Sequence, residues 1–69
     1  MFRLEWGNIT DGYILIGEYS TQGEMLIAIK THIEQIKFKS YYMRGWETSD
    51  GYTMCDYGGH TNFFRYKRI

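Results

Sequence analysis

TQGEMLIAIKTHIEQIK, residues 21–37, is the stretch of this chain in which apolar residues recur at helical spacing. At about 3.6 residues per turn they fall on one side of a helix, and they are Met25, Leu26, Ile29, Ile33 and Ile36. Thr21 and Glu24 have the spacing of a capping box, in which Thr21 accepts from the Glu24 amide and Glu24 reaches back. We therefore predict a helix from Thr21 to about Lys37 that covers one face of a sheet.

Two helix residues lie outside this stripe. Ile27 faces away from it and is expected to be exposed. His32 lies at its edge, and we interpret it as a partly buried packing residue without a direct functional role.

The segments on both sides of the helix predict short strands joined by tight turns. Residues 2–9 alternate apolar and polar side chains, and residues 13–19 form the return strand. The sequence after the helix predicts three more strands, at residues 40–47, 52–57 and 60–67. The predicted fold is α+β: an antiparallel sheet of about five short strands with one covering helix, in the order ββαβββ and in a single domain of residues 1–69.

Asp11-Gly12 predicts a two-residue type I′ turn, which fixes a register for the first hairpin. This register pairs Leu4 with Tyr19 and Trp6 with Gly17. It places three residues on the face opposite Leu4, Trp6 and Leu15, namely Ile9, Ile14 and Ile16. They form an exposed patch if the helix covers the Leu4 face. The alternative is that they lie in the core and the aromatic rings lie outside.

Asp50-Gly51 and Gly58-Gly59 predict two further tight turns. Two-residue turns there align Trp46, Cys55 and Asn62 across the last three strands, with Met54 and Phe63 on the other face. The tripeptide Asp-Gly-Tyr occurs twice, at residues 11–13 and 50–52. We interpret it as two independent solutions to the same turn.

Composition and charge limit the class of protein. The chain has one cysteine and hence no internal disulfide, no run of 18 apolar residues and no signal peptide at its start, so we expect a soluble cytoplasmic protein without membrane partners. Residues 1–36 contain two basic and five acidic residues, whereas residues 37–69 contain six basic and three acidic residues. Either the basic half contacts phosphate or an acidic protein, or the two halves pair within the fold.

Catalysis, metals and cofactors are not expected. Cys55, Asp56 and His60 are close in sequence, but a cysteine nucleophile also needs oxyanion donors and a pocket. Cys55 is therefore expected to be a small buried residue. Cys55, His32 and His60 are too few for a closed zinc site, and the sequence contains no phosphate-binding glycine loop. We expect no enzyme activity, no metal and no cofactor.

Basic and aromatic residues interleave in residues 37–46 and 63–68. This pattern is typical of surfaces that stack unpaired bases, of protein interfaces and of half-buried strands with one solvated face. The residues that we expect to contact a partner are Tyr41, Arg44, Tyr52, Tyr57, Arg65 and Lys67.

The tail DYGGHTNFF, residues 56–64, resembles the ending of short uncharacterised accessory proteins of phages and prophages in Gram-positive hosts. That group includes inhibitors of CRISPR nucleases and of other host defences. The resemblance implies stoichiometric binding to a host protein or nucleoprotein, without catalysis.

The expected function is thus a small interaction module, with a phage-encoded inhibitor as the setting. One alternative is a single-stranded nucleic-acid-binding protein that uses the same basic and aromatic surface. Another is a structural homodimer that buries Ile9, Ile14 and Ile16 or pairs an open sheet edge.

Overall fold

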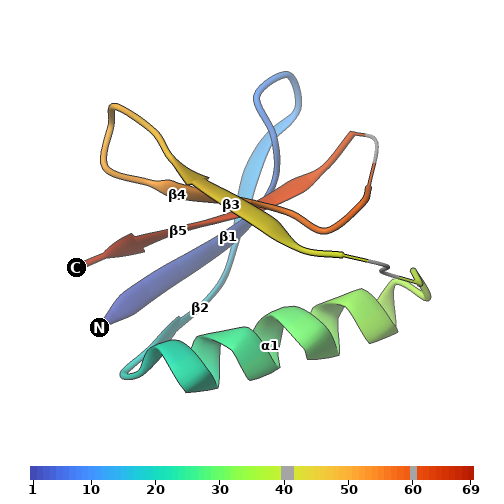
Figure 1. Cartoon of the computed structure of the whole chain (residues 1–69), viewed down its shortest axis with the longest axis horizontal. Coiled ribbons are helices and arrows are strands. Elements are labelled where there is room, and N and C mark those ends of the chain that lie inside the picture. Colours follow the sequence, from blue (N-terminus) through green and yellow to red (C-terminus); the bar gives the residue numbers. More distant parts are fainter. Residues whose placement is uncertain (40–41, 60) are drawn as a thin grey trace.

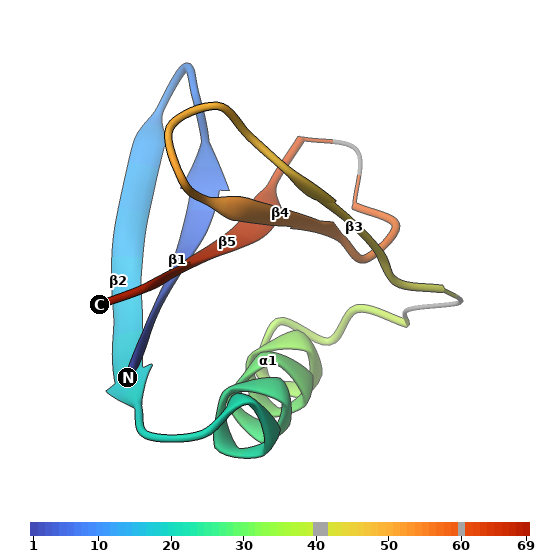
Figure 2. The same cartoon turned by 60° about the vertical axis from the view of Figure 1, so that its left-hand side comes forward.

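A computed structural model describes residues 1–39, 42–59 and 61–69, and it confirms an α+β fold in the order ββαβββ. The elements are β1 (Phe2–Asn8), β2 (Gly12–Tyr19), α1 (Gln22–Gln35), β3 (Arg44–Glu47), β4 (Thr53–Asp56) and β5 (Phe63–Arg68). The strands form one antiparallel sheet in the order β2-β1-β5-β4-β3, and α1 lies across one of its faces (Figures 1 and 2). The last strand, β5, therefore lies in the middle and joins the two hairpins β1–β2 and β3–β4.

Residues at both ends of α1 explain where the helix begins and ends. Thr21 Oγ1 accepts from the Glu24 amide at 3.2 Å, as predicted, but the Glu24 carboxylate accepts from the Ser20 hydroxyl at 3.4 Å. The helix ends earlier than expected because Lys37 adopts a positive φ of 57°. The Lys37 amide then donates to the Glu34 carbonyl and the Phe38 amide to the Ile33 carbonyl, which is a Schellman ending.

The core lies between α1 and the sheet face that carries Leu4 and Phe64. Its buried residues are Leu4, Met25, Ile29, Ile33, Cys55, Tyr57 and Phe64. His32 packs beside them as predicted, with its ring centroid 4.8 Å from that of Trp6 and 5.5 Å from that of Phe64. The predicted stripe was too wide, since Leu26 is 43% exposed and Ile36 is 38% exposed. The buried sector is displaced toward His32, away from Leu26, and Ile36 lies at the C-cap.

The predicted register of the β1–β2 hairpin was wrong, because its loop is longer than two residues. Asn8 pairs with Gly12, which has a φ of 88°, so residues 9–11 form a three-residue loop. The Asn8 side-chain oxygen accepts from the Asp11 amide at 2.7 Å and stabilises this loop. As a result Leu4 pairs with Gly17 and Trp6 with Ile14.

A β-bulge between Leu4 and Glu5 leaves Ile16 as the extra residue of β2. Ile16 consequently packs against the core, whereas Leu15 pairs with Glu5 on the opposite face and is 59% exposed. The expected patch of three isoleucines on one exposed face is therefore not formed.

The predicted register of the last three strands was also wrong. Trp46 pairs with Met54, and Cys55 pairs with Phe64. The β3–β4 loop is five residues long, residues 48–52, and is closed by the Thr48 amide donating to the Tyr52 carbonyl at 2.8 Å. Trp46 and Met54 therefore lie on the face away from α1, and Cys55 lies on the face that α1 covers.

Candidate functional site on the open sheet face

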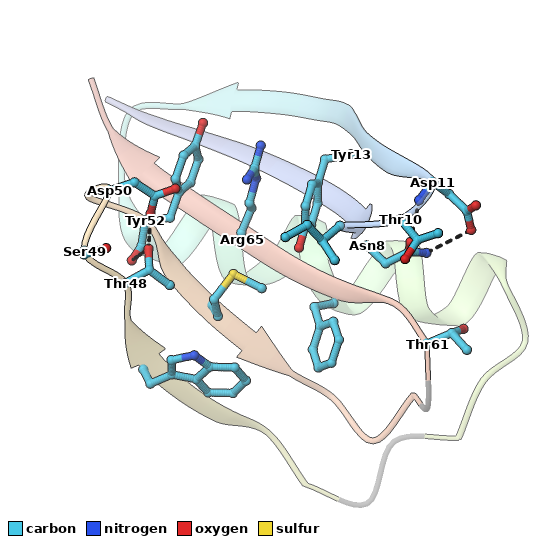
Figure 3. Close-up of a pocket in the computed structure, with 14 residues that line it drawn as sticks. Asn8, Thr10, Asp11, Tyr13, Thr48, Ser49, Asp50, Tyr52, Thr61 and Arg65 are labelled. Atoms are coloured by element: carbon cyan, nitrogen blue, oxygen red, sulfur yellow. Dashed lines mark hydrogen bonds between the residues drawn. The ribbon is translucent and has the colours of Figure 1, made fainter.

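The face of the sheet opposite α1, here called the open face, contains a groove of about 720 Å³ (Figure 3). The floor of this open-face groove is formed by Tyr13, Trp46, Tyr52, Met54, Phe63 and Arg65. Its two ends are the tips of the hairpins, residues 8–11 and residues 48–50, with Thr61 beside the first. The groove thus runs between the two loops that contain Asp-Gly.

Arg65 occupies the middle of the groove, with a tyrosine on each side (Figure 3). Its guanidinium carbon lies 3.8 Å from the centroid of Tyr13 and 4.0 Å from that of Tyr52. Arg65 Nε donates to Glu5 Oε1 at 2.5 Å, and these two residues are paired across β1 and β5. Stacking on both faces and an ion pair at one edge hold the guanidinium in one orientation.

The two tyrosines belong to the two copies of Asp-Gly-Tyr. Tyr13 follows Asp11-Gly12 at the start of β2, and Tyr52 follows Asp50-Gly51 at the end of the β3–β4 loop. Because β5 lies between the two hairpins, the ring after each turn reaches Arg65 from its own side. The repeated tripeptide was the sequence signal for this arrangement, but only the strand order reveals that both copies contact the same arginine.

An apolar part of the floor lies beside this stack. Trp46 and Phe63 pack edge to face, with centroids 6.2 Å apart and an interplanar angle of 79°. Met54 lies on the same face, since it pairs with Trp46 on one side and with Arg65 on the other. Trp46 is 45% exposed, so a large aromatic surface faces solvent here. Our sequence-based set of contact residues missed Tyr13, Trp46 and Phe63. The predicted register placed Trp46 with Cys55, and the position of β5 between the two hairpins was not predicted.

Each end of the groove carries a carboxylate. Asp11 Oδ2 accepts from Asn8 Nδ2 at 3.2 Å in the first loop. In the second loop the Thr48 hydroxyl donates to Asp50, and this bond, with the nearby charge of Arg65 adding to it, holds the pKa of Asp50 below its usual value. Asp50 is therefore charged well below neutral pH.

The predicted contact residues are divided between several places. Tyr52 and Arg65 line the groove, and Lys67 Nζ lies 5.3 Å from the Tyr52 ring. Arg44 is at the β3 edge, where its Nη2 donates to Asp56 Oδ2 at 2.9 Å. Tyr57, which we expected to be exposed, is buried on the helix side and accepts from Trp6 Nε1 at 3.1 Å. Tyr41 lies outside the described residues.

The predicted dimer residues are also separated. Ile9 is exposed and lines the hairpin end of the groove, and Ile14 is 57% exposed on the helix side of β2. Ile16 packs against the core and so faces neither surface.

Cys55 is buried, as predicted, and burial raises the pKa of its thiol. It faces α1 and not the groove. His60, the proposed neighbour of Cys55, lies outside the described residues. Within residues 1–39, 42–59 and 61–69 there is no group of three histidine, cysteine, aspartate or glutamate side chains that could hold a metal ion.

Comparison of the chain with protein-family models, with curated proteins and with solved structures gives no match. In the part of the chain that the structure describes, no helix is both long enough and apolar enough to span a membrane. The open-face groove is therefore the feature from which a function can be argued.

Proposed function

We propose that this chain is a protein-binding module that docks its partner on the open-face groove. The groove combines an exposed tryptophan with half-buried tyrosines and a half-buried arginine, which are the residue types enriched at the energetic centres of protein interfaces. Arg65 is already ordered by Tyr13, Tyr52 and Glu5. Binding through it therefore costs less conformational entropy than binding through a free arginine. This pre-ordered stack is the observation that carries the proposal.

The proposed binding is stoichiometric and non-catalytic. The groove floor offers aromatic rings, a thioether and a guanidinium that is paired with Glu5, and its hydroxyls belong to Thr10, Thr48, Ser49, Thr61 and the two tyrosines. Cys55, the chain's one thiol, lies on the other side of the sheet. These placements favour a surface for binding over one for bond-making chemistry.

A protein partner is favoured over single-stranded nucleic acid. Of the three basic residues expected to contact a partner, two have carboxylate partners, Arg44 with Asp56 and Arg65 with Glu5. The groove ends carry Asp11 and Asp50, which repel a phosphate backbone. Aromatic rings remain available for base stacking, so the salt dependence of binding is the appropriate discriminator.

The resemblance of residues 56–64 to phage accessory proteins supplies the setting that we propose, in which the partner is a host defence protein in the cytoplasm. The resemblance does not depend on the groove. A partner of another origin would leave the docking proposal intact.

A second candidate function, assembly into a homodimer, is favoured by strand β2. It is an edge strand of the sheet. Its adjacent residues Ile14 and Leu15 are both more than half exposed, one on each face of the sheet. An apolar edge strand of eight residues is a template for pairing with another chain. Ile14→Glu is expected to reduce the hydrodynamic mass to that of a monomer if this edge pairs, and an unchanged mass would exclude this interface.

The docking proposal is tested by affinity capture from a nuclease-treated bacterial lysate at physiological salt. We expect the native chain to retain a stoichiometric protein and Trp46→Ala to lose it. Ile27→Ala is the matched control, because Ile27 is 66% exposed on α1, away from the groove. Equal capture by all three proteins would show that the groove is not the docking surface. If material captured from an untreated lysate is absent from the nuclease-treated one, nucleic acid is favoured as the partner instead.

A further inference from the structure

We propose that the open-face groove selects an extended, basic segment of the partner, in which an apolar side chain lies between two lysine or arginine residues about four positions apart. This inference rests on the proposed function, because it names the chemistry of the segment that docks at the same groove. Three features support it: the charges at the ends of the groove, the distance between them and the apolar floor.

The carboxylates at the two ends of the groove form no salt bridge among the described residues. Among the residues that line it, the charged ones are Asp11, Asp50 and Arg65. Arg65 is neutralised by Glu5 at 2.5 Å, whereas Asp11 and Asp50 have uncharged hydrogen-bond donors, Asn8 and Thr48. A partner with a positive charge at each end therefore complements the groove, and an acidic partner is repelled.

The strand pairing sets the distance between the two carboxylates. Gly7, next to the first loop, pairs with Phe63, whereas Lys67 lies beside Gly51 in the second loop. Four residues of β5 separate these points, which is about 13 Å along the strand, and about three strand spacings, roughly 14 Å, separate the two hairpin loops across the sheet. The diagonal is then about 19 Å. Two residues four positions apart in an extended chain are about 13 Å apart, and long cationic side chains bridge the difference.

The floor between the carboxylates accepts the residue in the middle of such a segment. In an extended chain, residues i, i+2 and i+4 point to the same side. When the outer two residues reach Asp11 and Asp50, the middle residue therefore faces the floor. The middle side chain then meets the stack of Tyr13, Arg65 and Tyr52. The apolar part of the floor lies beside this stack and favours an aromatic or aliphatic side chain there; it consists of Trp46, Met54 and Phe63.

Short peptides test this inference without knowledge of the partner. The probe is acetyl-Lys-Thr-Phe-Thr-Lys-amide, and the controls are acetyl-Glu-Thr-Phe-Thr-Glu-amide and the reordered acetyl-Lys-Lys-Thr-Phe-Thr-amide. Each is titrated into the isotope-labelled chain while backbone amide shifts are recorded by NMR. We expect the probe to shift the amides of groove residues, Trp46 and Tyr13 included. The glutamate control should shift none of these amides, and the reordered control should bind several-fold more weakly.

The variant Asp11→Asn/Asp50→Asn completes the test. Both residues are exposed in loops, so the variant should keep the circular dichroism spectrum of the native chain. We expect its affinity for the probe to fall about three- to tenfold, because each exposed charge pair contributes a modest amount. Absence of groove shifts with the probe, or equal binding of the glutamate control, overturns the inference. The docking proposal stands on its own if partner capture still depends on Trp46, and it fails if capture is indifferent to Trp46.

Discussion

The two faces of this small sheet are both rich in aromatic residues, yet they are built for different surroundings. On the covered face, Phe64 packs against Tyr57 and His32 beneath the aliphatic stripe of α1. On the open face, Phe63 packs against Trp46, and the neighbouring tyrosines enclose a charged guanidinium. Phe63 and Phe64 are adjacent in sequence, so alternation along one strand separates a core residue from a groove residue.

This difference shows that aromatic content alone does not identify a core. The covered face excludes water because α1 supplies apolar atoms above it, with Met25 and Ile29 fully buried. The open face has no covering element among the described residues, and it keeps polar groups between its rings. Because the tyrosine rings stack on the charged guanidinium of Arg65, they can face solvent in the free protein and still contact a bound partner.

The largest loss of stability that tests the difference between the two faces is expected from Phe64→Ala. Removing a fully buried phenylalanine costs about 3–5 kcal/mol, which is most of the stability of a chain this small. Urea unfolding followed by circular dichroism measures it. Phe63→Ala is the matched control and should cost about 1 kcal/mol or less, because the ring is partly exposed. Equal losses from the two variants would mean that the open face is also a core.

A second large effect is expected from Gly7→Ala, which tests the hairpin that brings Tyr13 to Arg65. A Cβ at Gly7 would clash with the Gly12 carbonyl oxygen and lie 2.9 Å from Tyr13 Cα, so backbone must move, at a cost of about 2 kcal/mol or more. At Gly12 a Cβ meets nothing within 4 Å, and Gly12→Ala should cost only the strain of its φ of 88°, about 1 kcal/mol. The reverse order of thermal stabilities would contradict the observed register.

A smaller effect is expected when the stack on the open face is dismantled. Arg65→Met keeps the length of the side chain but leaves Glu5 without its partner, and we expect a loss of about 1–2 kcal/mol. In a double-mutant cycle with Glu5→Gln, the two losses should not add, because both remove the same ion pair. Full additivity would show that the pair is not formed in solution.

The smallest effect concerns His32 on the covered face. Burial lowers the pKa of His32 from its usual value of 6.5, and its Nε2 is buried without a hydrogen-bond partner among the described residues. The unfolded chain therefore binds the proton more readily than the folded chain. The contribution of neutral His32 to the free energy of unfolding is fully present above pH 6.5, and it is lost as the pH drops from there toward the pKa of the folded state. Thermal unfolding between pH 5 and 8 should show this slope, and His32→Phe should remove it. A slope that persists in His32→Phe would have another origin.

Losses at lower pH are expected from different groups. The Gly58 amide and Arg44 lower the pKa of Asp56, and the Thr48 hydroxyl lowers that of Asp50. Their contributions are present above the usual value of 3.8 and disappear as the pH falls below it. The histidine and carboxylate contributions are thus separated on the pH scale.

The fold could be predicted from local patterns, whereas the site could not. The period of α1, the Thr21 cap and the runs of alternating residues gave the order ββαβββ, and the interior positions of His32 and Cys55 followed from it. The register could not be predicted, because Asp11-Gly12 fits a two-residue turn as well as the longer loop that Asn8 stabilises. A small change in loop length moves each side chain to a new partner.

The residues that line the groove depend on the same register. Tyr52 and Arg65 were predicted as contact residues from their chemistry alone, and both line the groove. To predict that Tyr13 and Phe63 line the groove, one must know that β5 lies between the two hairpins. This is a long-range pairing that no local pattern encodes. To predict that Trp46 lines the groove, one must know that the β3–β4 loop has five residues, because this length pairs Trp46 with Met54.

The most direct measurement of the division between the two faces is a comparison of Phe63→Ala with the native chain in two assays, urea unfolding and partner capture from nuclease-treated lysate. We expect Phe63→Ala to unfold within about 1 kcal/mol of the native chain and to lose the captured protein, because its ring forms part of the groove floor. Ile27→Ala should change neither result. A folded Phe63→Ala that captures the same protein as strongly as the native chain would contradict docking on the open face.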